Sequence, residues 1–266
     1  AIGGVPGYME HWSANRSFKD NICRLVLTEG GYLFDMAQEI ISSELRELSV
    51  YNTILSAIAQ GHNKLNDLFL TTGYSRAKIS VYMKNLSHFD IVEKIVSFET
   101  GGWDNAKKGI YRIKDTFVNF WFKFVFPYMS DLYRLTPEDF YDKHIEKQLD
   151  SYMNRYFCDV CMEYLQLLNK IGRVPFAIHK MGTWIGKTGT IDIIAQSSDR
   201  QNIVGLCNWE KPYLTMEMCE KLYESMEKAR VQSNHFYLFS AKAFEPALIE
   251  VAKKDSRFEL IDMNEL

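Results

Sequence analysis

The C-terminal part of the chain alternates short apolar runs with amphipathic stretches. Two apolar runs, one over 190–196 and one that ends at Leu206-Cys207-Asn208-Trp209, flank a polar turn at 197–202. This pattern predicts a β-hairpin, because strands are short runs bounded by turn residues. The other expected elements are strands near 174–179, 235–240 and 258–262 and helices over 215–231 and 246–254. Their alternation is typical of a small α/β domain with a mixed sheet.

Residues 48–114 show a different order of elements. Apolar positions at helical spacing predict a helix ended by Gly61, a short second helix, and a third helix that Ser75 caps. Two β-rich pieces at 91–98 and 109–114 follow, joined by a hairpin loop rich in Gly, Asp and Asn. Three helices followed by a two-stranded wing is the order of a winged helix-turn-helix unit.

The remaining stretches are helical by pattern. Residues 9–46 predict two helices on either side of Gly30-Gly31, and a long helical region is expected from Thr136-Pro137 to Ile171, where Gly172 ends it. The aromatic run 117–128 is too short to span a bilayer and contains a lysine, so it predicts a buried helix.

Composition and charge narrow the class of protein. A hydrophobic content of 47% and a charged content of 24% are ordinary for a globular chain. The net charge of −3 argues against a basic coat over the whole surface. Five cysteines without framework spacing indicate a reducing compartment, and with no visible signal peptide or membrane segment we expect a cytoplasmic protein.

The 48–114 region is basic within this acidic chain. Nine basic residues oppose five acidic ones, which leaves a net charge of +4. On the third helix and at the wing tip, cations stand where a winged helix meets DNA, and the candidate DNA-binding residues are Ser75, Arg76, Lys78, Lys84, Lys107 and Lys108. The alternative is a winged helix that packs only against neighbouring domains, with these cations on a solvated face.

Two short motifs do not predict the sites that they suggest. Gly186-Lys187-Thr188 has Met181 where a phosphate-binding loop needs its first Gly, and a strand follows instead of a helix, so we expect a turn. Cys158 and Cys161 form a C-x-x-C in the middle of a helix without a second pair at metal-binding spacing, which favours packing. The six histidines are scattered along the chain.

The whole chain resembles a known family. The opening GGVPGY, the stretch IYRIKDTFVNFWFKFVFP and the order GTWIG, IDIIA, CNW and FYLFS resemble archaeal-type ATPases of the AAA/STAND kind, which carry a C-terminal domain of unknown function. The most specific piece is 111–127. The sequence has neither Walker motif and begins without Met, so the resemblance implies a C-terminal portion whose ATP and Mg²⁺ belong to a missing N-terminal ATPase domain.

The resemblance implies a multi-domain α+β chain in three parts. Residues 1–46 would be the remnant of the helical lid of the ATPase, residues 47–130 the winged helix-turn-helix with its aromatic helix, and residues 131–266 a degenerate nuclease-like α/β domain with a mixed sheet. Expected partners are double-stranded DNA and the missing ATPase domain, with no membrane.

The last domain of that family is similar to PD-(D/E)xK nucleases. A Glu is usual where this chain has Cys158, Glu-Ile-Asp where it has Thr190-Ile191-Asp192, and Glu-Cys-Lys-Trp where it has Leu206-Cys207-Asn208-Trp209. Asp192 alone remains of the charged set. Because one carboxylate holds a hard cation weakly, we expect Asp192 to be vestigial, with no active catalytic residue, no metal and no cofactor.

The sequence thus favours a non-enzymatic DNA- or partner-binding regulatory module. A divergent Mg²⁺-dependent nuclease with relocated acidic residues is the first alternative, and a purely protein-binding module is the second.

Overall fold

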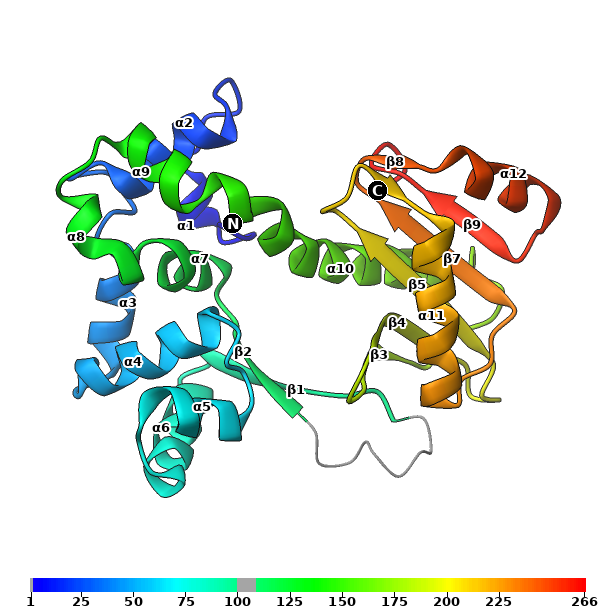
Figure 1. Cartoon of the computed structure of the whole chain (residues 1–266), viewed down its shortest axis with the longest axis horizontal. Coiled ribbons are helices and arrows are strands. Elements are labelled where there is room, and N and C mark those ends of the chain that lie inside the picture. Colours follow the sequence, from blue (N-terminus) through cyan, green and yellow to red (C-terminus); the bar gives the residue numbers. More distant parts are fainter. Residues whose placement is uncertain (1, 100–108) are drawn as a thin grey trace. The chain divides into compact units, whose positions relative to one another are not determined.

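The structure is a computed structural model that describes residues 2–99 and 109–266. The chain divides into two compact units, one of residues 1–95 and 109–148 and the other of residues 96–108 and 149–266 (Figure 1). Each unit is described by itself. The three-part division expected from the sequence stays a prediction.

The first unit begins with short helices. They are α1 (Pro6–Met9), α2 (Phe18–Ile22), a π-helical turn (Cys23–Leu27) and α3 (Met36–Glu44). Ser17 caps α2 in a reciprocal pair with Asp20, which satisfies backbone donors at the helix start. Tyr8 donates a hydrogen bond to Asp115 at 2.9 Å, and Asp115 also caps the later helix α7. This bond fixes the N-terminal segment to the aromatic core.

Three helices and a two-stranded sheet follow in the expected order. The helices are α4 (Leu48–Ala59), α5 (Leu65–Thr72) and α6 (Arg76–His88), and the strands are β1 (Val92–Val96) and β2 (Gly109–Ile113). Gly73 ends α5 with a φ of 70°, a left-handed conformation that costs a glycine little. Ser75 caps α6 through the Lys78 N–H, as the sequence predicts.

The aromatic run forms a buried helix, as expected. Helix α7 (Thr116–Phe124) buries nearly its whole surface, and its phenylalanines at 117, 120, 122 and 124 are fully buried. Such a helix is hydrophobic on all sides because other elements surround it. A 3₁₀ turn (Phe126–Tyr128), α8 (Met129–Leu132) and α9 (Pro137–His144) complete the unit, with Thr136 capping α9 ahead of a proline.

The second unit contains a mixed five-stranded sheet in the order β3-β4-β5-β7-β9. Its strands are β3 (Lys180–Ile185), β4 (Thr190–Gln196), β5 (Asn202–Asn208), β7 (His235–Ser240) and β9 (Phe258–Ile261). The first three strands pair antiparallel, and β7 and β9 add in parallel. Strands β6 (Tyr213–Leu214) and β8 (Ala243–Phe244) form a separate small sheet.

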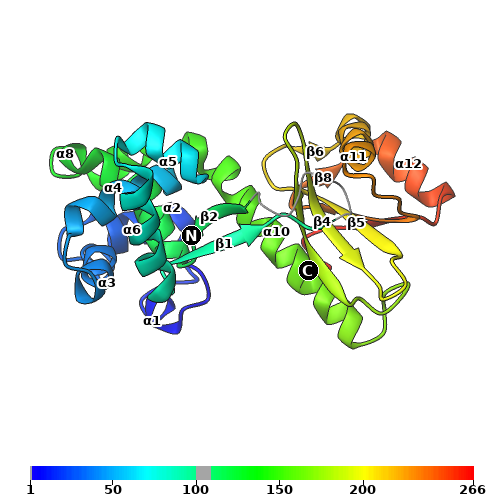
Figure 2. The ribbon, with the colours of Figure 1, turned by 90° about the horizontal axis from the view of Figure 1, so that it is seen from below.

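Helices cover both faces of this sheet (Figure 2). On one face lie α11 (Met216–Ala229) and α12 (Pro246–Lys254), which bury Leu222, Met226 and Leu248 against the strands. On the other lies the long helix α10 (Glu146–Lys170), which buries Phe157, Cys161 and Leu165. The mixed α/β class expected for this region is therefore confirmed.

Two local expectations have different outcomes. The strand near 174–179 is wrong: these residues are irregular, and the strand begins at Lys180. Pro175 lacks an N–H for a strand ladder, and the side chain of Asn169 instead binds both backbone groups of Ile178. The turn at Gly186-Lys187-Thr188 is confirmed, and it links β3 to β4.

Within the part of the chain that the structure describes, no helix combines the length and the apolar character needed to cross a membrane. The loop expected between the two strands of the wing, including Lys107 and Lys108, lies outside the described residues.

Candidate functional site

Asp192 lies at an irregularity of strand β4. Gly182 of β3 pairs with Ile194, but Trp184 pairs with Ile191, so β4 has one residue more than β3 between these points. Such a β-bulge re-aims side chains and is frequent beside functional sites. Here Ile191 packs on the α11 face while Ile193 packs on the α10 face. The bulge therefore lies at Asp192, where strict alternation is lost.

The bulge coincides with a gap in the strand ladder. The pairing of β4 with β5 begins at Ile193 and Gly205. Beyond it, the N–H of Cys207 donates to a carboxylate oxygen of Asp192 at 2.9 Å, so a side chain replaces a backbone partner. Among the described residues, this is the one hydrogen bond that the carboxylate accepts, although a carboxylate has about four acceptor positions.

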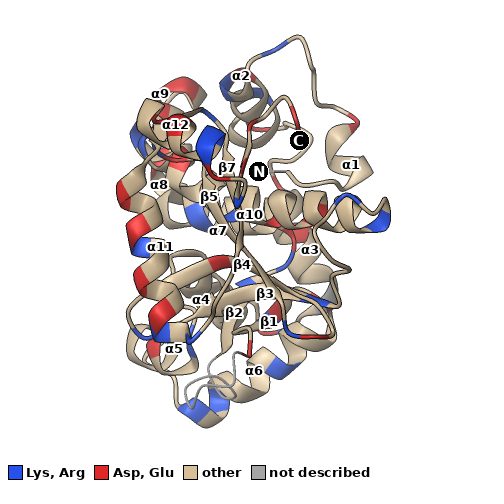
Figure 3. Cartoon of the chain, turned by 90° about the vertical axis from the view of Figure 1, so that its right-hand side faces the viewer, with Lys and Arg blue, Asp and Glu red and all other residues tan. Residues whose placement is uncertain are grey.

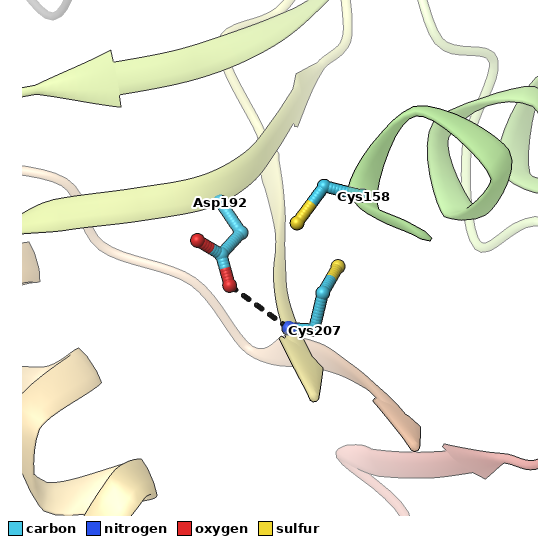
Figure 4. Close-up of side chains that lie close together, drawn as sticks. All are labelled: Cys158, Asp192 and Cys207. Carbon is cyan, nitrogen blue, oxygen red and sulfur yellow. Dashed lines mark hydrogen bonds between the residues drawn. The ribbon is translucent and has the colours of Figure 1, made fainter. Parts of the chain in front are cut away.

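Two thiols face this carboxylate. Cys158 comes from α10 and Cys207 from β5, and their sulfur atoms and a carboxylate oxygen of Asp192 all lie within 4.8 Å of one another (Figure 4). We call these three residues the thiol–carboxylate cluster. Cys161, one helical turn from Cys158, packs in the same cluster as Cys207. All five cysteines of the chain are free.

Burial controls the protonation of the cluster. It raises the pKa of Asp192 to about 6, against a smaller lowering by the Cys207 N–H. Burial, and then hydrogen bonds to Cys158 and Cys161, raise the pKa of Cys207 well above its usual value. The hydrogen bond from Cys207 lowers the pKa of Cys158, but burial and the charge of Asp192 outweigh it. Without a metal, both thiols are protonated at neutral pH and are poor nucleophiles.

Beside the cluster lies a group of polar residues that bond to one another, which we call the polar rim: Asp150, Asn154, Trp209 and Lys242. The backbone N–H of Trp209 donates to Asn154 at 2.7 Å, and its indole N–H donates to Asp150 at 3.2 Å. Asp150 also pairs with Lys242 at 2.6 Å. This lysine therefore has its charge compensated by a carboxylate that is not Asp192.

The structure corrects the expected placement of the second strand's residues. Leu206 packs on the α11 face, whereas Cys207 packs with α10 on the face of the cluster. Asn208 is buried and binds the backbone N–H and C=O of Lys211, at 3.0 and 2.9 Å. Leu206 and Asn208 therefore do not face Asp192. Cys207, between them, is the residue that does.

The sequence interpretation of Cys158 and Cys161 as simple packing residues missed a contact across the fold. No second pair of cysteines lies near this C-x-x-C in the sequence. The thiol that joins the group, that of Cys207, comes from strand β5. One signal was present: Cys158 and Asp192 stand at positions where the resembled nucleases carry site residues, and Cys207 lies between two more. Because β5 packs against α10, these residues lie close together in the folded chain.

Of the candidate DNA-binding residues, Arg76, Lys78 and Lys84 lie on α6. Ile79, Met83 and Leu86 bury one face of this helix, and the opposite face is exposed. Helix α6 contains basic residues and no acidic one (Figure 3). Arg76, Lys78 and Lys84 are exposed, and no carboxylate among the described residues forms an ion pair with them. The residues of this exposed face, which we call the α6 surface, are Arg76, Ala77, Lys78, Ser80, Val81 and Lys84.

Aromatic rings and an amide position two of these cations. The Arg76 guanidinium lies 4.1 Å from the ring centroid of Phe69 and donates to Asn66 at 2.7 Å. The Lys78 ammonium lies 4.7 Å from the ring of Tyr74. These contacts hold the charges at the start of α6 while leaving them in solvent. Ser75 serves here as a helix cap, with its hydroxyl on the Lys78 N–H.

Comparisons with known proteins find a family match for part of the chain and one archaeal relative. Residues 121–222 match the model of the DUF234 family, described as archaea bacterial proteins of unknown function. This segment includes the whole thiol–carboxylate cluster. An uncharacterized protein of Methanocaldococcus jannaschii is 28% identical over 209 residues, which make up 78% of this chain and 46% of that protein. The match thus spans less than half of that relative. No solved structure matches the chain.

Proposed function

We propose that this chain is a non-catalytic binding module in which α6 contacts duplex DNA and the α/β unit has a nuclease-like arrangement without nuclease chemistry. In this proposal α4, α5 and α6 with β1 and β2 act as a winged helix-turn-helix, and α6 is the recognition helix. The observation that carries it is the α6 surface, with three exposed cations and no acidic residue on the helix.

The composition of the α6 surface fits a helix that enters a major groove. Cations near its start suit phosphate oxygens, which supply most of the affinity for DNA. The small residues Ala77 and Ser80 and the exposed Val81 lie on the same face. Small and apolar side chains of this kind can contact thymine methyl groups or base edges.

The thiol–carboxylate cluster argues against Mg²⁺-dependent hydrolysis. Magnesium prefers an octahedron of oxygen ligands, and phosphodiester cleavage needs a cation to stabilise the charge that develops. The cluster offers one carboxylate and two thiols. Lys242, on the polar rim, is paired with Asp150. We therefore favour binding over nuclease activity as the function of this unit.

We also propose that the module works within a longer protein whose ATPase domain controls it, as the family resemblance implies. The partial match to the archaeal relative, which extends well beyond the aligned region, is consistent with such a parent. ATP and Mg²⁺ would then act in the other domain, outside the residues described here.

The test is fluorescence anisotropy of a labelled DNA duplex at several salt concentrations. We expect salt-dependent binding that weakens at least about tenfold at low salt in the Arg76→Ala, Lys78→Ala double variant. Lys254→Ala is the control, because it removes an exposed cation of the other unit. No binding at low salt would contradict the proposal and favour a protein-binding module. Mg²⁺-dependent plasmid cleavage abolished by Asp192→Ala would favour a nuclease.

A further inference from the structure

We propose that the thiol–carboxylate cluster is a binding site for a thiophilic divalent cation, with Zn²⁺ as the metal that fits best, ligated by the sulfur atoms of Cys158 and Cys207 and by the carboxylate of Asp192. This goes beyond the proposed function, because it concerns the α/β unit and does not depend on DNA binding by α6.

The ligand atoms are already gathered for such an ion. The three atoms lie within 4.8 Å of one another and come from three different elements, α10, β4 and β5. In a tetrahedral zinc site with Zn–S distances of about 2.3 Å, two sulfur ligands lie about 3.8 Å apart. The separation in the structure, at most 4.8 Å, is within about 1 Å of that spacing. In Figure 4 both sulfur atoms point into the space beside the carboxylate.

The carboxylate supplies an independent indication of a ligand. Among the described residues its oxygens accept only the Cys207 N–H, although Asp192 is half-buried beside Cys207, on the face whose apolar cluster includes Phe157, Ile193 and Phe239. A charge in such a place normally has a cation or several donors beside it. The backbone of Asp192 is also held, because the Thr183 hydroxyl donates to its carbonyl at 2.8 Å. Acceptor positions on its side chain are still available.

The donor set selects the metal. Two sulfur ligands and one oxygen suit Zn²⁺ or Cd²⁺ and disfavour Mg²⁺ and Ca²⁺, which need oxygen ligands. Three protein ligands leave the fourth tetrahedral position for water or for Cys161, which packs in the same cluster as Cys207. Since the two thiols are protonated in the free protein, binding is an exchange: each thiol releases a proton to solvent, two Zn–S bonds form, and the already ionised carboxylate completes the site.

The experiment is a titration of the reduced full chain with Zn²⁺ and, in parallel, with Co²⁺ as a spectroscopic probe. Calorimetry in buffers of different ionisation enthalpy measures the protons released. We expect one Zn²⁺ per chain, release of about two protons at pH 7, and a thiolate-to-Co²⁺ charge-transfer band with the visible absorption of a tetrahedral site. The spectrum of the unmodified protein tests the ligand set without any substitution.

Variants identify the ligands. Cys158→Ser and Cys207→Ser should each weaken Zn²⁺ binding by more than about 100-fold, which exceeds the loss typical of an outer-shell residue. Cys219→Ser is the control matched to Cys207, because Cys219 is as buried as Cys207 but packs on the α11 face. The proposal is overturned if reduced protein binds no Zn²⁺, if Co²⁺ gives no thiolate band, or if Cys219→Ser loses binding as the other two do.

Discussion

The carboxylate of Asp192 occupies the place of a strand partner for Cys207, accepting its backbone N–H at 2.9 Å where the pairing of β4 with β5 has ended. A charged side chain thus completes the edge of an antiparallel ladder inside a mostly apolar layer. The backbone N–H needs an acceptor, because an unsatisfied buried donor costs about 1–3 kcal/mol. The negative charge is not needed for that bond, and keeping it buried is unfavourable.

This arrangement gives Asp192 a measurable effect on stability. Its pKa is raised to about 6 in the folded chain from an ordinary 3.8, mainly by burial. Between these two values the folded state binds more protons than the unfolded state, so the free energy of unfolding falls as the pH rises from about 4 to about 6. Above that window the cost is constant.

We therefore expect Asp192→Asn to raise the free energy of unfolding at pH 7 by about 1 to 2 kcal/mol in metal-free protein. The amide oxygen keeps the hydrogen bond from Cys207 while the charge is gone. Asp192→Ala removes the acceptor as well and should lower stability at pH 4. Urea unfolding at pH 4, 5, 6 and 7 with chelator measures both variants. An unchanged pH profile in Asp192→Asn would contradict this account.

Restoring the nuclease-type charges at Leu206 and Asn208 should fail. The double variant Leu206→Glu, Asn208→Lys carries the expected Glu-x-Lys, but Leu206 packs on the α11 face, away from Asp192. Asn208 is 1% exposed, and its replacement breaks two hydrogen bonds with Lys211. We expect no cleavage of plasmid DNA with Mg²⁺ and a loss of more than about 3 kcal/mol in stability.

The single variants act as controls for this experiment, since each should lose stability without gaining activity. Cleavage by the double variant that depends on Mg²⁺ and disappears on adding Asp192→Ala would show that the two residues reach the Asp192 side after all.

Local pattern was sufficient for most of the sheet and its helices. The strand 235–240 and the helix 246–254 occur with the bounds that the sequence predicts. The facing of Asp192 could not be predicted in the same way, because the bulge gives β4 one residue more than β3 and places Asp192 on the same face as Cys207 instead of that of Leu206. The proximity of Cys158 to Cys207 also depends on how α10 packs on the sheet, which the hydrophobic periodicity of the sequence does not predict. The segment 174–179 looked like a strand because its apolar residues pack on the α10 face without being in the ladder.

The Gly186-Lys187-Thr188 turn gives a prediction that separates geometry from motif. A Cβ at Gly186 would lie 2.2 Å from the buried ring of Trp184, so Gly186→Ala must displace that ring. We expect a loss of about 1–3 kcal/mol in thermal unfolding. Lys187 is exposed, and Lys187→Ala should change stability by less than about 0.5 kcal/mol. ATP with Mg²⁺ should stabilise neither the unsubstituted chain nor Lys187→Ala. Stabilisation by ATP that Lys187→Ala abolishes would indicate a phosphate site.

The last prediction distinguishes phosphate contact from base contact on α6. Lys84 and Arg76 lie on the same exposed face of α6, and neither has a carboxylate partner among the described residues. If Lys84 contacts a phosphate, Lys84→Ala should weaken binding equally on duplexes of different sequence and reduce the slope of log K against log salt by about 1.

Arg76→Lys keeps the charge, so the slope should stay unchanged. It loses the planar group that stacks on Phe69 and donates to Asn66, and at a base edge it should cost about 1–3 kcal/mol on preferred sequences only. Equal effects of Arg76→Lys on every duplex would restrict Arg76 to the backbone, and an unchanged slope in Lys84→Ala would remove Lys84 from the interface.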